Sequence, residues 1–336
     1  MFDILEQVNT WLAAGQTIAL GTVVETWGSA PRQAGAKMAV TAEMAMIGSV
    51  SGGCVETAVV SEMLDSLEDH KPRLLHFGVS DDTAWDVGLA CGGKITVYVE
   101  PLNVAWWQML ARNENQTFKT IIILSGEYAG AKVLLSDSMP SSVPLPPDML
   151  ALFAQAAEHC PHTARTQIEA WDVLIEVYEP HPRLIIIGGA HVAMALKQYA
   201  MMLGFRVHLI DPRKAFATAE RFPDVEKISH DYPDKALHTI ALDHNTYVAV
   251  LTHDPKIDDP ALQMVLPSQA AYIGVLSSRR THQKRLERLA ALGVDETLFS
   301  RIHTPIGIEI NAQSPEEIAL SIMAEIIAVK NKGITR

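Results

Sequence analysis

The sequence predicts an α/β protein in which an N-terminal mixed α+β domain is followed by a C-terminal Rossmann-like parallel α/β domain. A length of 336 residues suggests about two domains. From Arg183 onward, short apolar strands alternate with helices, as in a parallel sheet. Just before this change, Pro180-His181-Pro182 has the composition of a short stiff linker. We therefore expect domains at 1–179 and 183–330, with 102–179 the least informative stretch.

In the first domain, β-rich runs are separated by segments rich in Gly, Pro and Ser. The expected strands cover residues 17–25, 36–40, 45–50, 95–100, 120–124, 132–135 and 172–178. A helix is predicted from Val55 to about Leu67, because Val59 and Met63 complete an apolar stripe spaced by four. A second helix is expected near 148–159.

In the second domain, the apolar run 184–187 predicts a buried strand, and Gly188 begins the turn that follows it. A helix then runs through Leu203 and is stopped by Gly204. The later elements are expected to be strands at 205–210, 247–251 and 271–273, a helix at 280–292, and a last helix through about 329. Ser314 and Glu317, with proline between them, predict a capping box at the start of that last helix.

Composition excludes several classes of protein. The chain is 48% hydrophobic and 20% charged, which is ordinary for a soluble globular protein. Its net charge of −12 argues against nucleic acid or an anionic membrane as the main partner. We expect neither a signal peptide nor a membrane span, because no basic leader and no long apolar run is present. Three cysteines make no disulfide framework and fit a reducing, cytoplasmic compartment.

Two cysteines lie in mirror-image glycine settings. The segments are Ser51-Gly52-Gly53-Cys54 and Cys91-Gly92-Gly93. A diglycine reaches backbone conformations that other residues avoid and removes side-chain bulk. Each thiol is therefore expected at a tight turn that is open to a ligand. The pair indicates a site for a thiol-seeking ligand, such as a soft metal centre or a sulfur group.

The two thiols differ in their surroundings. Cys54 follows a predicted strand and precedes a predicted helix, so unpaired N–H groups and the helix dipole would favour its thiolate. Glu56 in the first turn would partly oppose that effect. The alternative for Cys54 is a small buried residue in a tight turn. Cys91 precedes a strand, where the dipole argument does not apply, and Cys160 has no such setting.

Two basic residues flank the first glycine-rich loop. Arg32 and Lys37 could contact an anionic ligand there, and a solvated surface position is the alternative for both. No Cys-x-x-Cys pair or Cys/His cluster is present, so a structural zinc site is not expected.

The turn after the first strand of the second domain resembles a degenerate dinucleotide fingerprint. Aligned on G-x-G-x-x-G, the segment 188–193 keeps only Gly188, and Ala190 and Ala193 replace the other glycines. A methyl group at Ala190 weakens a close pyrophosphate contact. Asp211 ends the next strand, near the spacing of a ribose-binding carboxylate. No substrate-side acid/base pair accompanies the turn, which argues against ordinary nicotinamide redox chemistry.

Two further loops follow predicted parallel strands and should reach the same edge of the sheet. One contains Thr252-His253-Asp254, and the other is Ser277-Ser278-Arg279-Arg280-Thr281. The carboxyl ends of parallel strands are where such sheets bind ligands. Hydroxyl and guanidinium groups at a helix start suit a phosphate. The alternatives are a plain loop histidine at His253 and solvated arginines at Arg279 and Arg280.

Taken together, these motifs resemble the XdhC/CoxI family, the xanthine dehydrogenase accessory proteins. The resemblance rests on segments in fixed order at both ends of the chain: 28–32, 35–38, 48–56, 88–93, 188–192, 251–255, 274–281, 302–307 and 315–319. One departure is the family's Gly-Ala-Gly-His turn, which here reads Gly188-Gly189-Ala190-His191. It weakens a close pyrophosphate contact but leaves the fold unaffected.

The resemblance implies a maturation factor rather than a turnover enzyme. It implies binding of the molybdenum cofactor, as molybdopterin or its nucleotide form, with Cys54 the main molybdenum contact and Cys91 the second. It also implies protection of the cofactor while a cysteine desulfurase supplies sulfur, delivery to a xanthine dehydrogenase-type molybdoenzyme, and a homodimer. Two alternatives stay open: an NAD(P)-dependent oxidoreductase, and a scaffold that only docks the desulfurase to its client.

Overall fold

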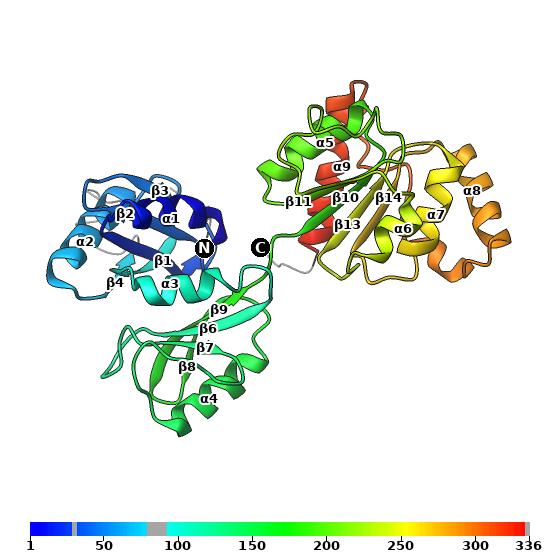
Figure 1. Ribbon diagram of the computed structural model, residues 1–336. Coiled ribbons are helices and arrows are strands. Elements are labelled where there is room, and N and C mark those ends of the chain that lie inside the picture. The colour runs from blue at the N-terminus through cyan, green and yellow to red at the C-terminus, as the bar shows by residue number, and fades with distance from the viewer. Residues whose placement is uncertain (29–31, 79–92, 333–336) are drawn as a thin grey trace. The chain divides into compact units, whose positions relative to one another are not determined.

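The computed structural model describes residues 1–28, 32–78 and 93–332. The chain divides into two compact units, Met1–Pro180 and His181–Arg336. Each unit has its own sheets and its own hydrophobic clusters, and each is described by itself below (Figure 1).

The first unit is built on a five-stranded antiparallel sheet in the order β3-β2-β1-β5-β4. Its strands are β1 (Ile18–Trp27), β2 (Lys37–Thr41), β3 (Met46–Gly48), β4 (Arg73–Phe77) and β5 (Lys94–Pro101). Helix α2 (Glu56–Asp69) covers one face, because its stripe residues Val59 and Met63 are fully buried against the sheet. The helix predicted from the four-residue spacing is therefore confirmed.

A second antiparallel sheet of the first unit has the order β7-β6-β9-β8. Its strands are β6 (Phe118–Ile123), β7 (Lys132–Leu135), β8 (Ala164–Ile168) and β9 (Trp171–Tyr178), and α4 (Pro147–Glu158) covers one face. A 3₁₀ turn (Phe2–Ile4), α1 (Leu5–Ala13) and α3 (Val104–Ala111) share a core with both sheets. Tyr98 and Leu174 also belong to one buried cluster, which brings the two sheets together.

Two buried ion pairs cross between these sheets. Lys37 Nζ of β2 lies 2.7 Å from Glu176 Oε1 of β9, and Lys132 Nζ of β7 lies 2.7 Å from Glu100 Oε2 of β5. Lys37 is only 2% exposed, so both expectations for it, an anion contact and a solvated surface, are wrong. Burial alone would raise the pKa of Glu176, but the charge and hydrogen bond of Lys37, together with the hydrogen bond from Tyr178 and the charge of the N-terminus, outweigh burial and lower it.

The second unit is a six-stranded parallel sheet in the order β12-β11-β10-β13-β14-β15. The strands are β10 (Arg183–Ile187), β11 (Arg206–Ile210), β12 (Lys227–Ser229), β13 (Thr246–Val250), β14 (Tyr272–Val275) and β15 (Ile302–His303). Counted along the unit, this is the 3-2-1-4-5-6 order of a Rossmann fold. The predicted fold class is therefore confirmed.

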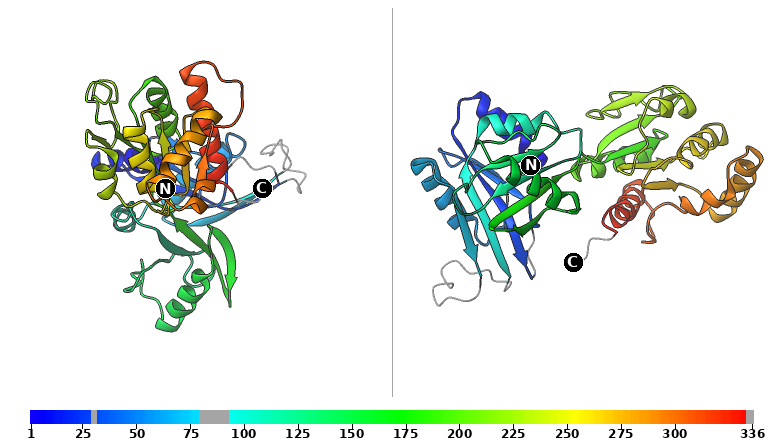
Figure 2. Two further views of the ribbon diagram at one scale, coloured as in Figure 1. Left: turned by 90° about the vertical axis from the view of Figure 1, so that its right-hand side faces the viewer. Right: turned by 90° about the horizontal axis from the view of Figure 1, so that it is seen from below.

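Helices cover both faces of the parallel sheet (Figures 1 and 2). One face carries α5 (His191–Met202) and α9 (Pro315–Lys330), and the other carries α6 (Pro233–His238), α7 (Pro255–Val265) and α8 (Arg279–Ala291), with a 3₁₀ turn at Glu296–Arg301. The predicted capping box at Ser314 and Glu317 begins α9 as expected. Among the described residues, no helix is both long and apolar enough to cross a membrane.

Candidate functional site

One end of the five-stranded sheet gathers the loops that carry the predicted thiol site. Trp27 of β1 pairs with Lys94 of β5, and Met38 of β2 pairs with Gly48 of β3. Because the strands are antiparallel, the segments after Trp27 and Gly48 and before Lys94 leave the sheet at the same end. A Cβ on Gly28 would lie 3.5 Å from the Cα of Gly93. The residue that follows β1 and the residue that precedes β5 are therefore close neighbours.

The predicted residues Cys91 and Gly92 lie outside the described residues, whereas Gly93 is described and buried at this end of the sheet. Arg32 connects two of the loops: its Nε donates to the carbonyl oxygen of Ser49 at 3.0 Å, and its Nη2 lies 3.4 Å from Asp3 Oδ2. The side chain of Arg32 is 35% exposed, so part of the guanidinium remains open to solvent beside the Cys54 loop.

The Cys54 loop is held by the side chain of Glu56. One carboxylate oxygen, Oε1, accepts hydrogen bonds from the Ser49 hydroxyl at 2.8 Å and from the backbone N–H groups of Ser51 at 2.8 Å and Gly52 at 2.9 Å. The other, Oε2, accepts from the Ser51 hydroxyl and from the N–H of Gly53 at 2.8 Å. A single carboxylate thus gathers most of the donors of this turn.

The remaining donors of the turn are used by Ser51. Its hydroxyl oxygen accepts from the backbone N–H groups of Cys54 and Val55, each at 3.1 Å. Every backbone N–H from Ser51 to Val55 is therefore paired. The N–H groups of the loop itself are therefore not available to stabilise a Cys54 thiolate, because Glu56 and Ser51 already occupy them.

The diglycine has a clear conformational role. Gly52 has φ +86° and Gly53 has φ +121°, both in the region that side chains disfavour. This backbone turns the N–H groups toward Glu56 and leaves Cys54 exposed. The alternative of a small buried cysteine does not hold.

The electrostatics of the turn follow from these hydrogen bonds. Partial burial would raise the pKa of Glu56, but the donors on Ser51, Ser49 and Gly53 outweigh it and lower the pKa to about 2. Glu56 is therefore ionised at neutral pH and places a fixed negative charge under the loop. Sequence reasoning assigned Glu56 only a weak opposing effect and missed its organising role.

In the second unit, the predicted glycine turn follows β10. Gly188 has φ +106°, and a Cβ there would lie 2.5 Å from Thr252 Cγ2. A Cβ on Gly189 would lie 2.5 Å from the carbonyl oxygen of Phe216. A side chain at either position would therefore clash with a neighbouring segment of the chain. Ala190 is the N-cap of α5 without a side-chain cap, and His191 is exposed at the first position of that helix.

Asp211 organises this turn from the end of β11. Its side chain is fully buried, and its Oδ2 accepts the N–H of Gly189 at 2.8 Å. Arg213 donates Nε to Oδ1 at 2.9 Å and Nη2 to Oδ2 at 2.8 Å. Burial raises the pKa of Asp211, but the bonds from Arg213 and Gly189 outweigh burial and lower it. Since both oxygens are engaged, a ribose hydroxyl would have to compete with Arg213.

The other two predicted loops leave the same edge of the parallel sheet. His253 is exposed and has φ +63°, a conformation in which histidine is found more often than most residues. Thr252 holds this turn, because its Oγ1 accepts the N–H of Asp254 at 3.1 Å and donates to Asp258 Oδ1. His253 is therefore displayed at the tip of a pinned loop.

The serine-rich loop after β14 begins α8. Ser277 is buried and donates to the carbonyl oxygen of Ser278 at 3.1 Å. Ser278 is exposed and is the N-cap of α8, accepting the N–H of Thr281 at 3.3 Å. Arg280 is exposed, and the side chain of Arg279 lies outside the described part of the structure.

A buried ion pair lies beneath these two loops. Arg285 Nη2 of α8 donates to Asp258 Oδ2 of α7 at 3.0 Å, and the two side chains are 2% and 1% exposed. Burial raises the pKa of Asp258 above its ordinary value. The hydrogen bond from Thr252 and the charge of Arg285 act in the opposite direction but do not outweigh burial. Sequence reasoning missed this pair, because α8 is so polar that a buried arginine gives no periodic signal.

Within residues 1–28, 32–78 and 93–332, no three His, Cys, Asp or Glu side chains gather as metal ligands. The predicted two-thiol arrangement involves Cys91, which lies outside these ranges. Cys160 is partly exposed, and its Sγ donates to the carbonyl oxygen of His162 at 3.0 Å.

These features define a two-unit protein that pairs a displayed cysteine loop on an antiparallel sheet with a Rossmann unit whose phosphate turn is degenerate. Two family models match it: the XdhC and CoxI family over residues 11–78, and the XdhC Rossmann domain over residues 184–326. The chain belongs to the XdhC and CoxI family.

Known proteins resemble nearly the whole chain. A Bacillus subtilis protein named as a probable xanthine dehydrogenase subunit is 28% identical over 93% of each chain. The molybdenum cofactor insertion chaperone PaoD of Escherichia coli is 29% identical over 95% of this chain and 85% of its own. The uncharacterized protein YqeB of Escherichia coli is 27% identical over 94% of this chain, which spans 44% of the length of YqeB.

A solved structure agrees with the fold. A crystal structure described as a xanthine dehydrogenase from Bacillus halodurans has a TM-score of 0.81 to this chain at 25% identity. The match covers 98% of this chain and 96% of that one.

Proposed function

We propose that this chain binds the molybdenum cofactor, protects it while a cysteine desulfurase supplies the terminal sulfur, and delivers it to a xanthine dehydrogenase-type molybdoenzyme. The observation that carries the proposal is the exposed Cys54, held on a rigid diglycine turn at the loop-bearing end of the first sheet. The names of two relatives, an insertion chaperone and a probable xanthine dehydrogenase subunit, support the same role.

The residues of the first unit suit this cargo. A cysteine thiolate is a soft ligand that molybdenum and sulfur-rich centres accept. Glu56 fixes the turn, so Cys54 is presented without a large loss of backbone entropy on binding. Arg32, partly open beside the loop, supplies a positive charge for an anionic part of the cofactor. With Cys91 as a second thiol, the loop-bearing end of the five-stranded sheet would hold the metal-bearing part of the cofactor.

The test is to express the chain in a host that makes the cofactor and to measure the pterin and molybdenum bound to the purified protein. We expect Cys54→Ser to lose most of the molybdenum, and Cys54→Ser with Cys91→Ser to lose the rest. Cys160→Ser is the matched control. Cys160 is not in a disulfide, and its thiol donates a hydrogen bond to the carbonyl oxygen of His162 in another part of the unit. Full retention of pterin and metal by the double variant contradicts a thiol ligand.

A nicotinamide-dependent oxidoreductase is the second candidate, favoured by the Rossmann strand order of the second unit. It requires saturable NAD(P)H binding and hydride transfer to a carbonyl substrate. The engaged carboxylate of Asp211 and the methyl group of Ala190 speak against it. A failure to bind either dinucleotide at about millimolar concentration, a binding free energy of roughly −4 kcal/mol, eliminates this candidate.

A further inference from the structure

Arg285 is a buried guanidinium with spare hydrogen-bond donors. It is 2% exposed, and its Nη2 donates to Asp258. Its Nε and Nη1 are buried without any hydrogen-bond partner among the described residues. A guanidinium carries five N–H donors and keeps its charge in proteins, so leaving most of them unpaired costs free energy. The position is therefore incomplete without a further acceptor.

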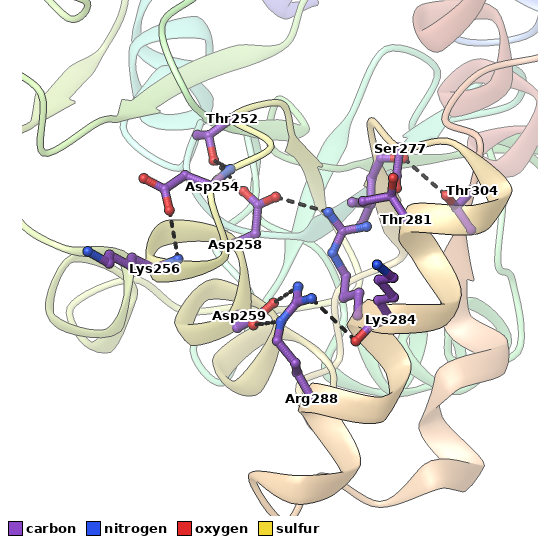
Figure 3. A network of polar contacts seen from close by, with 12 residues as sticks. Thr252, Asp254, Lys256, Asp258, Asp259, Ser277, Thr281, Lys284, Arg288 and Thr304 are labelled. Carbon is purple, nitrogen blue, oxygen red and sulfur yellow. Dashed lines mark hydrogen bonds and ion pairs between the residues drawn. The ribbon is translucent and has the colours of Figure 1, made fainter.

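The neighbouring arginine of the same helix shows the contrast. Arg288 Nε and Nη2 donate to the two carboxylate oxygens of Asp259 at 2.6 and 3.0 Å, and its Nη1 donates to the Lys284 carbonyl oxygen at 3.3 Å. Figure 3 shows this pair on the flank of α8, while Asp258 and Thr281 lie closer to the loop that carries Ser277. All three guanidinium nitrogens of Arg288 are used, whereas Arg285 uses one within the part of the chain that the structure describes.

Helix geometry directs the guanidinium of Arg285 toward the N-terminal end of α8. Side chains on a helix lean toward its N-terminus, and residues four apart share a face, so Arg285 lies beneath Thr281. Its bond to Asp258, in the first turns of α7, engages Nη2 and leaves Nε and Nη1 as the donors without a partner among the described residues. His282 is near the same guanidinium: burial and the charge of Arg285 lower its pKa, and its Nδ1 is buried without a partner in the described ranges.

The N-terminal end of α8 also offers polar groups to a ligand. The hydroxyls of Ser278 and Thr281 are 3.0 Å apart and exposed, and the first turn carries no acidic residue. The helix is 13 residues long, so its dipole adds positive potential at this end. Helix N-termini with hydroxyls and an arginine are favourable sites for phosphate.

We propose that Arg285, with Ser278 and Thr281 at the start of α8, binds a phosphoryl group. This inference rests on the proposed function, in which the phosphate is that of the pterin or of an attached nucleotide. The dinucleotide turn at β10–α5 is less suited to it, because Asp211 takes the N–H of Gly189 and Ala190 adds a methyl group. The phosphoryl subsite therefore lies at the β14–α8 connection.

The experiment titrates the full chain, purified without cofactor, with inorganic phosphate by calorimetry at constant ionic strength set with chloride. We expect Arg285→Lys to weaken phosphate binding by about tenfold or more, the loss of a charge-assisted hydrogen bond. Arg288→Lys is the matched control and should bind as the unmodified chain does. Because Arg285 is buried, Thr281→Val provides a second variant at an exposed position, and it too should weaken binding.

Two further arms identify the source of the phosphoryl group. Phenyl phosphate represents a terminal monoester, and NAD represents an internal pyrophosphate. Binding of phenyl phosphate alone assigns the subsite to a terminal phosphate, and binding of both ligands, each weakened by Arg285→Lys, assigns it to either form. No calorimetric signal from phosphate, or equal losses in the Arg285 and Arg288 variants, overturns the proposal. If phosphate binds but the chain purified from a cofactor-producing host carries no pterin, the proposed function fails and the subsite stands.

Discussion

Glu56 Oε2 accepts the backbone N–H of Gly53, which lies three residues earlier in the chain, at 2.8 Å. The first residue of α2 thus reaches back over the diglycine and closes the turn that presents Cys54. The loop therefore needs no bound anion to satisfy its N–H groups. Its shape is set before any ligand arrives, which lowers the entropic cost of binding.

Replacing the organising carboxylate should loosen the thiol loop. Glu56→Gln keeps the size of the side chain but removes the charge and one acceptor oxygen, so we expect a loss of about 1–3 kcal/mol in unfolding free energy. Urea unfolding gives the value. Glu62→Gln on the same helix, which removes only a surface pair with Arg73, should change stability by less than about 1 kcal/mol. Equal losses in the two variants would contradict the organising role.

The contribution of Glu56 should depend on pH in a defined window. Its pKa in the folded chain is about 2, below the ordinary value of 4.5. A carboxyl group with a lowered pKa adds stability that is fully present above 4.5 and is lost as the pH falls toward 2. The stability gap between the unmodified chain and Glu56→Gln should therefore shrink between about pH 5 and 3, measured by urea midpoints. A gap that stays constant over this range would refute the assignment.

The buried pair of Lys37 and Glu176 should behave as a unit. Lys37→Met leaves a buried carboxylate without its partner and should cost about 3–5 kcal/mol. Adding Glu176→Gln removes the stranded charge while keeping an acceptor for the Tyr178 hydroxyl, which lies 2.8 Å from Glu176. We expect the double variant to recover most of the loss in urea unfolding. Arg73→Met, at an exposed pair, is the control, and a double variant no more stable than Lys37→Met would contradict the coupling.

The methyl group of Ala190 should limit dinucleotide binding. Ala190 is the N-cap of α5 and makes no side-chain cap, so glycine there should not destabilise the helix. If the methyl group keeps a pyrophosphate away, Ala190→Gly should tighten NAD binding by several-fold over a weak starting value, measured by calorimetry. Gly188→Ala should weaken NAD binding and destabilise the second unit, because its Cβ would lie 2.5 Å from Thr252 Cγ2. Unchanged NAD affinity in Ala190→Gly would show that the methyl group is not the barrier.

The sequence predicted the central elements better than the edges. The run from Leu184 to Ile187 is fully buried, and so are Val59 and Met63 of α2, so both elements carry a clear apolar pattern in the sequence. By contrast, β4, β8 and β12 lie at sheet edges, and most of their residues are half-exposed or exposed. Strands without a buried face carry no clear alternation, and these three were not predicted; β3, also an exposed edge strand, was predicted at 45–50.

The candidate site was predicted in the same uneven way. The display of Cys54 follows from its glycine neighbours, which can be identified in the sequence. The function of Glu56 depends on the φ angles of Gly52 and Gly53, which the sequence does not specify. The burial of Arg285 depends on how α8 packs against α7, and a helix of such polar composition gives no sign of it.

The arrangement of the first sheet has a consequence for how such proteins diversify. The loops after β1, β3 and β4 leave one end of the sheet, while the ion pairs that join the two sheets of this unit are buried in the strands. In the Cys54 loop, Val50 and Val55 are fully buried in the core of this sheet, whereas the residues 52–54 between them are exposed. Changes that are meant to alter ligand preference should therefore be confined to the exposed part of this loop, while Val50, Val55 and Glu56 are kept to hold it on the sheet.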